Sequence, residues 1–343
     1  MQILRYSFLF LLISSLYSYG MQVGSGSLKL IQSKQLVAAL PLIAKQKLGT
    51  VSESQLRAPE TVDFNINGIC NLDCKWCWGP VHNAKESVSL SEWKNLAYNL
   101  RRLGTKNVVF TGGETLLKKD LPELARYVNA ELGIRTTLSS NGLLLVKRGP
   151  SVLPYVNDLG LPLDGPNVEI NSIMRKGTPL HFSKVLEAIR FTQNNFSGVN
   201  LTVRTVVAQP NVDFVHLIGK TFIEHGINPQ AMRWKLYQVS PIGPRKEQIL
   251  NGDLLITRRQ FDETIAKTRL MNPSFNIDAQ PYENSFGRYF HVFPDGKSHI
   301  VTQGKDGLPF ELETGDVVKD FDGVISKVNE VFNFSHNSKH GKN

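Results

Sequence analysis

The chain has 343 residues, of which 41% are hydrophobic and 20% are charged, and no repeat or low-complexity tract interrupts it. This composition excludes a disordered or fibrous protein and is ordinary for one large globular domain with extensions. Lys and Arg outnumber Asp and Glu by 39 to 30, so the net charge of +9 indicates an anionic partner without choosing among nucleotide, nucleic acid and membrane.

Residues 1–20 resemble a signal peptide or a membrane anchor. Arg5 precedes the apolar run Phe8–Leu16, and small or polar residues follow it. The run is too short to cross a bilayer by itself. Three interpretations stay open: an anchor that leaves the rest of the protein on the cytosolic side, an organelle-targeting sequence, or a true start at Met21.

Residues 21–55 are expected to form an amphipathic helix and a linker. Within them, Ser27–Leu48 carries Leu and Ile residues spaced among lysines. Such a pattern suits a helix that lies on a surface, until Pro41 disturbs it. The segment is therefore expected to hold the protein on a surface as well as to link residues 1–20 to the barrel.

All three cysteines of the sequence lie within eight residues, as Cys70, Cys74 and Cys77. A C-x-x-x-C-x-x-C triplet offers three thiolates to one metal centre, and a [4Fe–4S] cube held by three cysteines leaves one iron open for a non-protein ligand. The same cysteines together with His82 also match a zinc site, which the spacing alone leaves open. A disulfide framework fits worse, because one thiol would be left over.

Apolar, strand-like runs alternate with amphipathic helical stretches from about residue 56 onward. Strands are expected at Thr61–Asn67, Lys106–Thr111, Ile134–Ser139, Tyr155–Leu163, Asn200–Ala208 and Met232–Val239. Helices are expected at Ser91–Leu103, Leu121–Leu132, Phe182–Asn194, Asp213–Glu224 and Thr257–Arg269. This rhythm favours parallel strands. We predict an α/β fold, a partial (β/α)6 TIM-like barrel over residues 56–245, with its active site at the carboxyl ends of the strands.

Beyond the barrel, residues 246–330 are expected to form a small C-terminal extension that covers it. A P-D-G turn in this part predicts a hairpin in which Arg288–Phe293 pairs with Lys297–Thr302. Residues 331–343 are expected to be a polar tail.

The cysteine triplet, with Trp76 before its last cysteine, resembles the signature of the radical S-adenosylmethionine (SAM) enzymes. Two further motifs follow in the order of that family: T-G-G-E at Thr111–Glu114, directly after a predicted strand, and T-L-S-S-N-G at Thr137–Gly142. Arg175 stands where the family has an arginine after its fourth strand. The matches cover about residues 61–240, and they imply a partial barrel of the radical SAM type.

The resemblance implies a role for each of these residues. Cys70, Cys74 and Cys77 would hold a [4Fe–4S] cluster whose open iron binds SAM. The implied SAM-binding residues are Trp76, Gly112, Gly113, Glu114, Ser140, Asn141 and Arg175. An electron from a reductase or ferredoxin-like donor would cleave SAM, and the resulting 5′-deoxyadenosyl radical would take a hydrogen atom from the substrate. Taken alone, the Gly-Gly and Asn-Gly pairs would be ordinary turns.

The sixth predicted strand resembles that of viperin-like enzymes, radical SAM proteins that dehydrate nucleoside triphosphates, particularly CTP. Lys235, in R-W-K, would correspond to a phosphate-binding lysine, and Arg204 to another basic residue. Tyr289 stands near a substrate-contacting tyrosine of that family, although the strand-forming aromatic residues of Tyr289–Phe293 are more typical of a core. The sequence departs from the viperin-like pattern at Val206, Pro162 and Thr115, in place of asparagine, serine and proline.

The favoured function is a radical SAM enzyme that acts on a small molecule, in the viperin-like case a CTP-type nucleotide dehydratase. The alternatives are a radical SAM enzyme that modifies a peptide, a nucleic acid or another small metabolite, and a noncatalytic zinc-binding module. Without further cysteines, these 343 residues cannot build the second cysteine-ligated cluster of many peptide-modifying relatives. No RNA-binding appendage is visible, so nucleic acid is not favoured. An oxygen-sensitive cluster favours the cytosolic side, with or without membrane association, over secretion.

Overall fold

Ten strands form one continuous sheet in the computed structural model, which describes residues 56–79 and 87–332. Their order across the sheet is β10-β9-β8-β1-β2-β3-β4-β5-β6-β7. Neighbouring strands from β8 through β1 to β7 are parallel, whereas β9 is antiparallel to both β8 and β10. The strands are β1 (Thr61–Asn65), β2 (Asn107–Thr111), β3 (Arg135–Ser139), β4 (Asp158–Pro162), β5 (Asn200–Val207), β6 (Arg233–Gln238), β7 (Asn276–Gln280), β8 (Phe290–Val292), β9 (Lys297–Gln303) and β10 (Pro309–Asp316).

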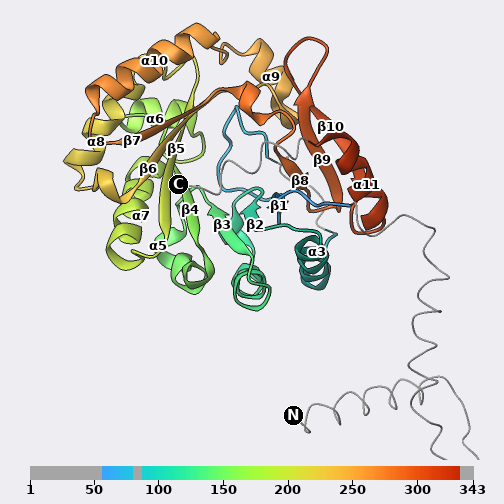
Figure 1. Ribbon diagram of the computed structural model, residues 1–343. Coiled ribbons are helices and arrows are strands. Elements are labelled where there is room, and N and C mark those ends of the chain that lie inside the picture. The colour runs from blue at the N-terminus through green and yellow to red at the C-terminus, as the bar shows by residue number, and fades with distance from the viewer. Residues whose placement is uncertain (1–55, 80–86, 333–343) are drawn as a thin grey trace, which may run out of the picture. The chain divides into compact units, whose positions relative to one another are not determined.

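The sheet curves into an arc with helices along its outer side (Figure 1). The α-helices of the described residues are α3 (Leu90–Arg102), α4 (Leu121–Arg126), α5 (Leu145–Arg148), α6 (Val168–Met174), α7 (His181–Asn195), α8 (Ile218–Glu224), α9 (Lys246–Asn251), α10 (Arg258–Met271) and α11 (Phe321–Val331). Helix α3 shows how the local sequence sets a boundary. Ser89 and Glu92 form a capping box that satisfies free backbone N–H groups at its first turn.

Alternation along the strands separates an apolar outer side from a polar inner side. In β1, Val62 and Phe64 are fully buried, and the Phe64 ring lies 4.8 Å from the ring of Trp93 in α3. Because successive side chains point to opposite faces, Asp63 and Asn65 face the inner side of the arc. The hydrophobic core therefore lies between the sheet and the helices, and the concave side is left for polar groups.

The predicted partial barrel of the radical SAM type is confirmed, with antiparallel strands added at its C-terminal end. The six expected strands correspond to β1–β6, and the expected hairpin to β8 and β9. Pro162 is the last residue of β4, so its missing N–H interrupts no ladder within that strand. The parallel strand β7 was not predicted, because its sequence N-I-D-A-Q contains one large apolar residue.

Residues 246–332 continue the sheet at both ends, since β7 pairs with β6 and β8 pairs with β1. Segments 1–20 and 21–55 lie outside the described residues, and so does the tail 331–343 apart from its first two residues. Among the residues that are described, no helix combines the length and the apolar character needed to cross a membrane.

Replacing Trp93 tests the packing of the outer core. Trp93→Ala should lower the free energy of unfolding by about 3–5 kcal/mol, because it removes a fully buried side chain that packs on β1. Trp93→Phe should cost clearly less, because the indole N–H that it removes has no hydrogen-bond partner among the described residues. Urea denaturation of the two variants, prepared without iron, measures the difference, and equal losses would contradict this account.

Candidate functional site

The three cysteines lie on one loop between β1 and α3, beyond the carboxyl end of β1. Cys74 is buried, whereas Cys70 and Cys77 are half-buried. The Cys77 N–H donates to the carbonyl of Cys74 at 3.1 Å, and Asp73 N–H donates to the carbonyl of Lys176 at 2.7 Å, which ties the loop to the chain after α6. Burial raises the pKa of the Cys74 thiol to about 12, although the charge of the nearby Arg175 opposes this. A metal that binds there has to replace the thiol proton.

The donor set suits a cluster better than a single ion. Among the described residues, no three His, Cys, Asp or Glu side chains converge closely enough to hold one metal ion. In a [4Fe–4S] cube each thiolate binds a different iron, so the three sulfurs stand further apart than the ligands of one ion. Space beside Cys77 is kept free by glycine, because a Cβ on Gly79 would lie 3.4 Å from the Cys77 Sγ and 2.9 Å from the Gly112 carbonyl. His82, the fourth ligand of the zinc alternative, lies outside the described residues.

The Gly-Gly turn after β2 is packed directly against the start of the cysteine loop. Gly113 N–H donates to the carbonyl of Asn67 at 3.0 Å, and Glu114 N–H donates to that of Ile69 at 2.7 Å. A Cβ on Gly113 would lie 2.0 Å from the Ile69 carbonyl oxygen, and Gly112 has a φ of +133°. Only glycine fits both positions. The sequence motif therefore positions the cysteine loop by backbone contact.

Glu114 joins the turn after β2 to the segment after β3. Its carboxylate accepts hydrogen bonds from Ser140 Oγ and from the Asn141 N–H, both at 2.7 Å, and from the Leu116 N–H at 3.0 Å. The side chain is buried, and burial raises its pKa although the hydrogen bonds favour the charged form. The structure thus brings together Glu114, Ser140 and Asn141, three of the residues that the motifs assigned to SAM. Three of about four acceptor positions of the carboxylate are used internally.

Asn141 connects this network to the cysteines. Its Nδ2 donates to Asn71 Oδ1 at 2.6 Å and lies 3.9 Å from the Cys70 Sγ. Its carbonyl accepts from His181 Nε2 at 3.1 Å, and the other ring nitrogen of His181 lies 3.0 Å from Asn171 Nδ2. Burial lowers the pKa of His181 to about 3, so the ring is neutral and can make both bonds. Sequence reasoning missed His181, because nothing near it in the chain marks it.

Arg175 lies beside the cysteine loop, where it contacts Trp76. Its Nε donates to Asp164 Oδ2 at 2.5 Å, and its guanidinium lies 4.4 Å from the centre of the Trp76 ring. The Trp76 Nε1–H donates to the Met174 carbonyl at 3.1 Å. Asp164, which follows β4, also accepts from the Val206 N–H at 2.8 Å and holds Arg175 in place. The rest of the guanidinium fork is available for an anion.

Arg204 and Lys235, the first two predicted substrate residues, are register partners on β5 and β6. Arg204 lies across Gly160, where a Cβ would come within 2.3 Å of its Cζ, and its Nη1 donates to Ser139 Oγ. Its Nε is buried without a hydrogen-bond partner. Neither cation forms an ion pair with a carboxylate among the described residues. The two positive charges therefore share the inner face of the sheet without a counter-ion from the part of the chain that the structure describes.

Tyr289, the third predicted substrate residue, precedes β8 and faces the same interior. Its ring stacks on that of His291, with centroids 5.7 Å apart and an angle of 5° between the planes. Burial raises the pKa of Tyr289, the neighbouring Tyr237 and Asp63 raise it further, and Arg204 opposes them. The tyrosine therefore lies within electrostatic reach of Asp63 on β1, Arg204 on β5 and Tyr237 on β6.

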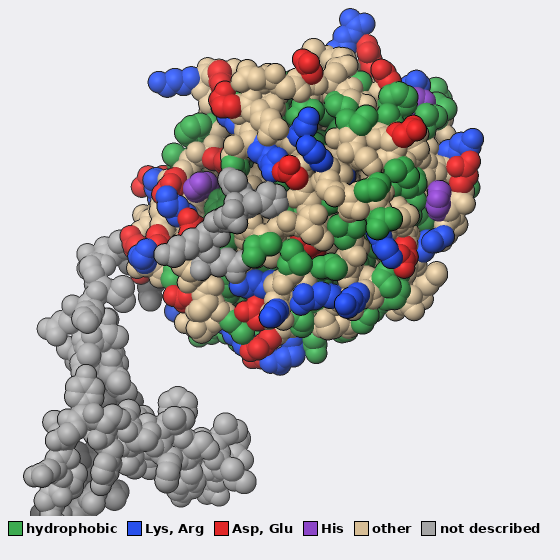
Figure 2. Space-filling model, turned by 180° about the vertical axis from the view of Figure 1, so that it is seen from behind, with side chains coloured by type: hydrophobic (Ala, Val, Ile, Leu, Met, Phe, Trp, Pro, Cys, Tyr) green, Lys and Arg blue, Asp and Glu red, His purple; other side chains and the backbone are tan. Residues whose placement is uncertain are grey.

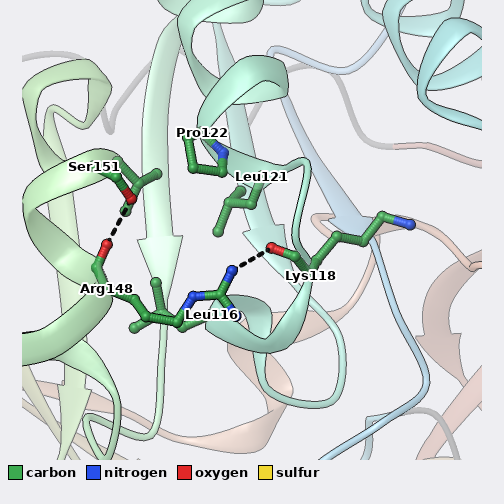
Figure 3. A pocket seen from close by; sticks show the side chains of 7 residues that line it. Leu116, Lys118, Leu121, Pro122, Arg148 and Ser151 are labelled. Atoms are coloured by element: carbon green, nitrogen blue, oxygen red, sulfur yellow. Dashed lines mark hydrogen bonds between the residues drawn. The ribbon is translucent and has the colours of Figure 1, made fainter.

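Two hollows lie near the Gly-Gly turn. The larger, with a volume of about 290 Å³, is lined by Asn67, Ile69, Leu117, Lys118, Lys119 and Asp120. The smaller lies on the outer side between α4 and α5, where Arg148 Nη2 donates to the Lys118 carbonyl at 3.4 Å (Figure 3). No water-sized sphere fits into this second hollow. It is a packing feature, whereas the larger one adjoins the cysteine loop.

Comparison with known proteins identifies relatives of this arrangement. The family model of the Radical SAM superfamily matches residues 64–214. A PqqA peptide cyclase from Rhodopseudomonas palustris is 35% identical over 74% of this chain and 69% of its own length. An S-adenosylmethionine-dependent nucleotide dehydratase from Flammeovirga pacifica is 23% identical over 64% of this chain and 76% of its own length. The solved structure of native anSMEcpe with bound AdoMet shares the fold, with 18% identity, a TM-score of 0.59 and coverage of 80% and 83%.

The chain spans about half the length of the first curated relatives that it matches. One of them, an AdoMet-dependent heme synthase from Oleidesulfovibrio alaskensis, is 29% identical over 60% of this chain and 51% of its own length. The names of these relatives differ in what they act on: a peptide, a nucleotide and heme.

Substitution of Gly113 tests the contact between the turn and the cysteine loop. Gly113→Ala should lower the free energy of unfolding by about 1–3 kcal/mol and reduce the iron bound after anaerobic reconstitution, because the added Cβ displaces the Ile69 carbonyl. The matched control is Gly198→Ala, where a Cβ meets nothing within 4 Å. Iron analysis and urea denaturation measure both effects. Full iron binding by Gly113→Ala would show that the loop does not depend on this contact.

The neutral His181 predicts a pH dependence of stability. The unfolded chain binds a proton on this histidine below about pH 6.5, whereas the folded protein resists protonation down to about pH 3, so stability falls as the pH falls between these values. The loss should approach about 1.4 kcal/mol per pH unit relative to His181→Gln, which keeps a donor and an acceptor but does not titrate. Urea denaturation of both iron-free proteins between pH 6 and pH 4 measures the difference. Parallel pH profiles would refute the neutral buried ring.

Proposed function

We propose that this chain, which belongs to the radical SAM superfamily, removes a hydrogen atom from a nucleoside triphosphate and dehydrates it. A [4Fe–4S] cluster and SAM supply the radical chemistry when they are bound. In this proposal Cys70, Cys74 and Cys77 hold three of the irons. The residues assigned to SAM are Trp76, Gly112, Gly113, Glu114, Ser140, Asn141 and Arg175.

The pair of uncompensated cations inside the sheet is the observation that carries the choice of substrate. Arg204 and Lys235 are adjacent in register, and no carboxylate among the described residues neutralises them. A buried or half-buried cation without a partner is costly unless a ligand supplies the opposite charge. A triphosphate carries several negative charges and acceptor oxygens, and it suits a guanidinium beside an ammonium group.

The residues that surround the interior then have separate tasks. Lys235 and Arg204 hold the phosphates, and the Arg204 guanidinium is kept over the inner face because Gly160 leaves room for it. Tyr289 contacts the nucleotide from the wall formed by β8. The Asp164–Arg175 pair faces the carboxylate of SAM. Together these residues orient the sugar toward the cysteine loop and exclude water, which is the protein's part in cofactor chemistry.

Two of the relatives bear on the choice between a nucleotide and a peptide as substrate. This chain covers 76% of the nucleotide dehydratase from Flammeovirga pacifica and 69% of the PqqA peptide cyclase, whereas its identity is higher to the cyclase, at 35% against 23%. A peptide is therefore the second candidate. Membership of the family also favours the cluster over the zinc-binding module that the cysteine spacing left open.

Nucleic acid is a weaker candidate, and the one face seen in Figure 2 shows no gathering of positive charge. Lys and Arg side chains alternate there with Asp and Glu, and no broad field of one sign is visible. A nucleic-acid partner would require a basic stripe along which phosphates could bind. The partners proposed are a small nucleotide and a reductase or ferredoxin-like protein that donates electrons on the cytosolic side.

The proposal predicts which compound stimulates SAM cleavage. Reconstituted protein with dithionite and SAM should form 5′-deoxyadenosine faster with CTP or another nucleoside triphosphate than without it. Lys235→Met should raise the CTP concentration for half-maximal stimulation about 10- to 100-fold, because one charge-assisted contact is lost. Chromatography of the nucleosides measures both.

Two control variants accompany this experiment. Lys220→Met, which removes an exposed lysine of α8, should leave the stimulation unchanged. Cys74→Ala should abolish SAM cleavage altogether. If no nucleotide raises SAM cleavage by the unsubstituted protein, the nucleotide assignment is wrong and the peptide candidate takes its place.

A further inference from the structure

A carboxylate and an imidazole face each other inside the sheet and have no role in the function proposed so far. Asp63 of β1 and His291 of β8 are register partners, and Asp63 Oδ2 lies 3.0 Å from His291 Nδ1. They are only 6% and 3% exposed. Both sit on the inner face, because their strand neighbours Phe64 and Val292 are fully buried on the other side.

The pair shares its space with the predicted substrate residues. The charge of Asp63 raises the pKa of Tyr289 and the charge of Arg204 lowers it, and the Tyr289 ring stacks on that of His291. The cations of β5 and β6 and the Asp63–His291 pair therefore lie on different walls of one interior. A ligand anchored by its phosphates on Arg204 and Lys235 would extend toward this second wall.

Trp78 places the pair next to the cysteine loop. Its ring centroid lies 4.3 Å from that of His291, and Trp78 directly follows Cys77. The imidazole is thus held between Trp78 on the loop and Tyr289 on its own segment. A group in this position is close to the place where the cofactor chemistry would occur.

Other titratable groups also face His291. Glu311 of β10 and His299 of β9 both lie within its electrostatic reach, and His299 is its register partner. Asp63 is the one that contacts it, at Nδ1. No described residue bonds to Nε2, on the opposite side of the ring. That nitrogen is left for a ligand.

A purely structural role explains the pair poorly. The Nδ1–Oδ2 approach does not have the geometry of a hydrogen bond, since Nδ1 has no hydrogen-bond partner among the described residues. A buried charged pair contributes little to stability compared with well-packed apolar side chains. Two apolar residues would join β1 to β8 at lower cost, so the pair is better explained by chemistry.

We propose that His291, oriented by Asp63, is the general acid that protonates the hydroxyl group leaving the substrate. The proposal rests on the nucleotide-dehydrating function above. After the hydrogen atom is removed, the carbon radical stands beside a carbon that bears a hydroxyl group. That C–O bond breaks with its electron pair on oxygen, and the Nε2 proton of the imidazolium joins this oxygen, so that water leaves and His291 becomes neutral.

The reaction then needs one more electron, and the protein that reduces the cluster can supply it. Loss of water leaves a radical cation on the sugar. One electron from the reduced iron–sulfur or flavin protein converts it into the unsaturated product. Asp63 is the positioning residue in this step: its carboxylate lies 3.0 Å from Nδ1, on the side of the ring away from Nε2, and places a negative charge beside the imidazole.

The test compares the dehydrated nucleotide with 5′-deoxyadenosine formed in the same reaction. In His291→Gln holoenzyme with CTP, the ratio of dehydrated nucleotide to 5′-deoxyadenosine should fall about a hundredfold, the usual size of a general-acid contribution. Cleavage of SAM should continue, because it precedes the proton transfer. Asp63→Asn should lower the ratio in the same direction but less. A structural defect would instead lower both products together.

His299→Gln is the matched control, since His299 lies opposite His291 on β9 and also in part faces the interior. Its ratio should equal that of the unsubstituted enzyme. A normal ratio in both His291→Gln and Asp63→Asn overturns the acid assignment while the nucleotide function stands. If the unsubstituted enzyme cleaves SAM but dehydrates no nucleotide, the nucleotide function and this inference both fail.

Discussion

The buried carboxylate of Glu114 is the contact on which the arrangement of the site depends. Three donors from two segments converge on it: the Leu116 N–H from its own turn, and Ser140 Oγ and the Asn141 N–H from the segment after β3. Burying a carboxylate is costly unless such donors offset the loss of water. Because Asn141 then reaches Asn71 and His181, one buried carboxyl group sets the relative positions of the cysteine loop, two strand ends and α7.

The interior of the sheet is divided by charge, and this division follows from the pairing of the strands. Arg204 and Lys235 come from neighbouring parallel strands and point the same way because their register is direct. Asp63 and His291 are likewise opposite each other on β1 and β8. A shift of one residue in either pairing would turn these side chains into the apolar outer core. The same alternation that buries Phe64 and Trp234 therefore places the charges where a ligand can meet them.

The sequence predicted features that depend on neighbouring residues, but not contacts between residues that are far apart in the chain. β1–β6 and the T-G-G-E and S-S-N-G turns follow from local patterns, and they were predicted. The contacts that complete the site are distant in sequence: His181 meets Asn141 across 40 residues and Asn67 meets Glu114 across 47. No local pattern marks His181 or Asp63. The strand β7 also escaped prediction, because its pairing with β6 compensates for a nearly polar sequence.

The two tryptophans around Cys77 show how the cysteine loop is held on both sides. Trp76 is turned toward the chain after β4, where its ring lies under Arg175 and its N–H meets the Met174 carbonyl. Trp78 is turned the other way, onto His291, and its carbonyl is so close to Gly243 that a Cβ there would lie 2.6 Å away. Cys77 is thus fixed between the segments that follow β4 and β6 and the strand β8 itself. A loop fixed from three directions leaves the Cys77 sulfur little freedom.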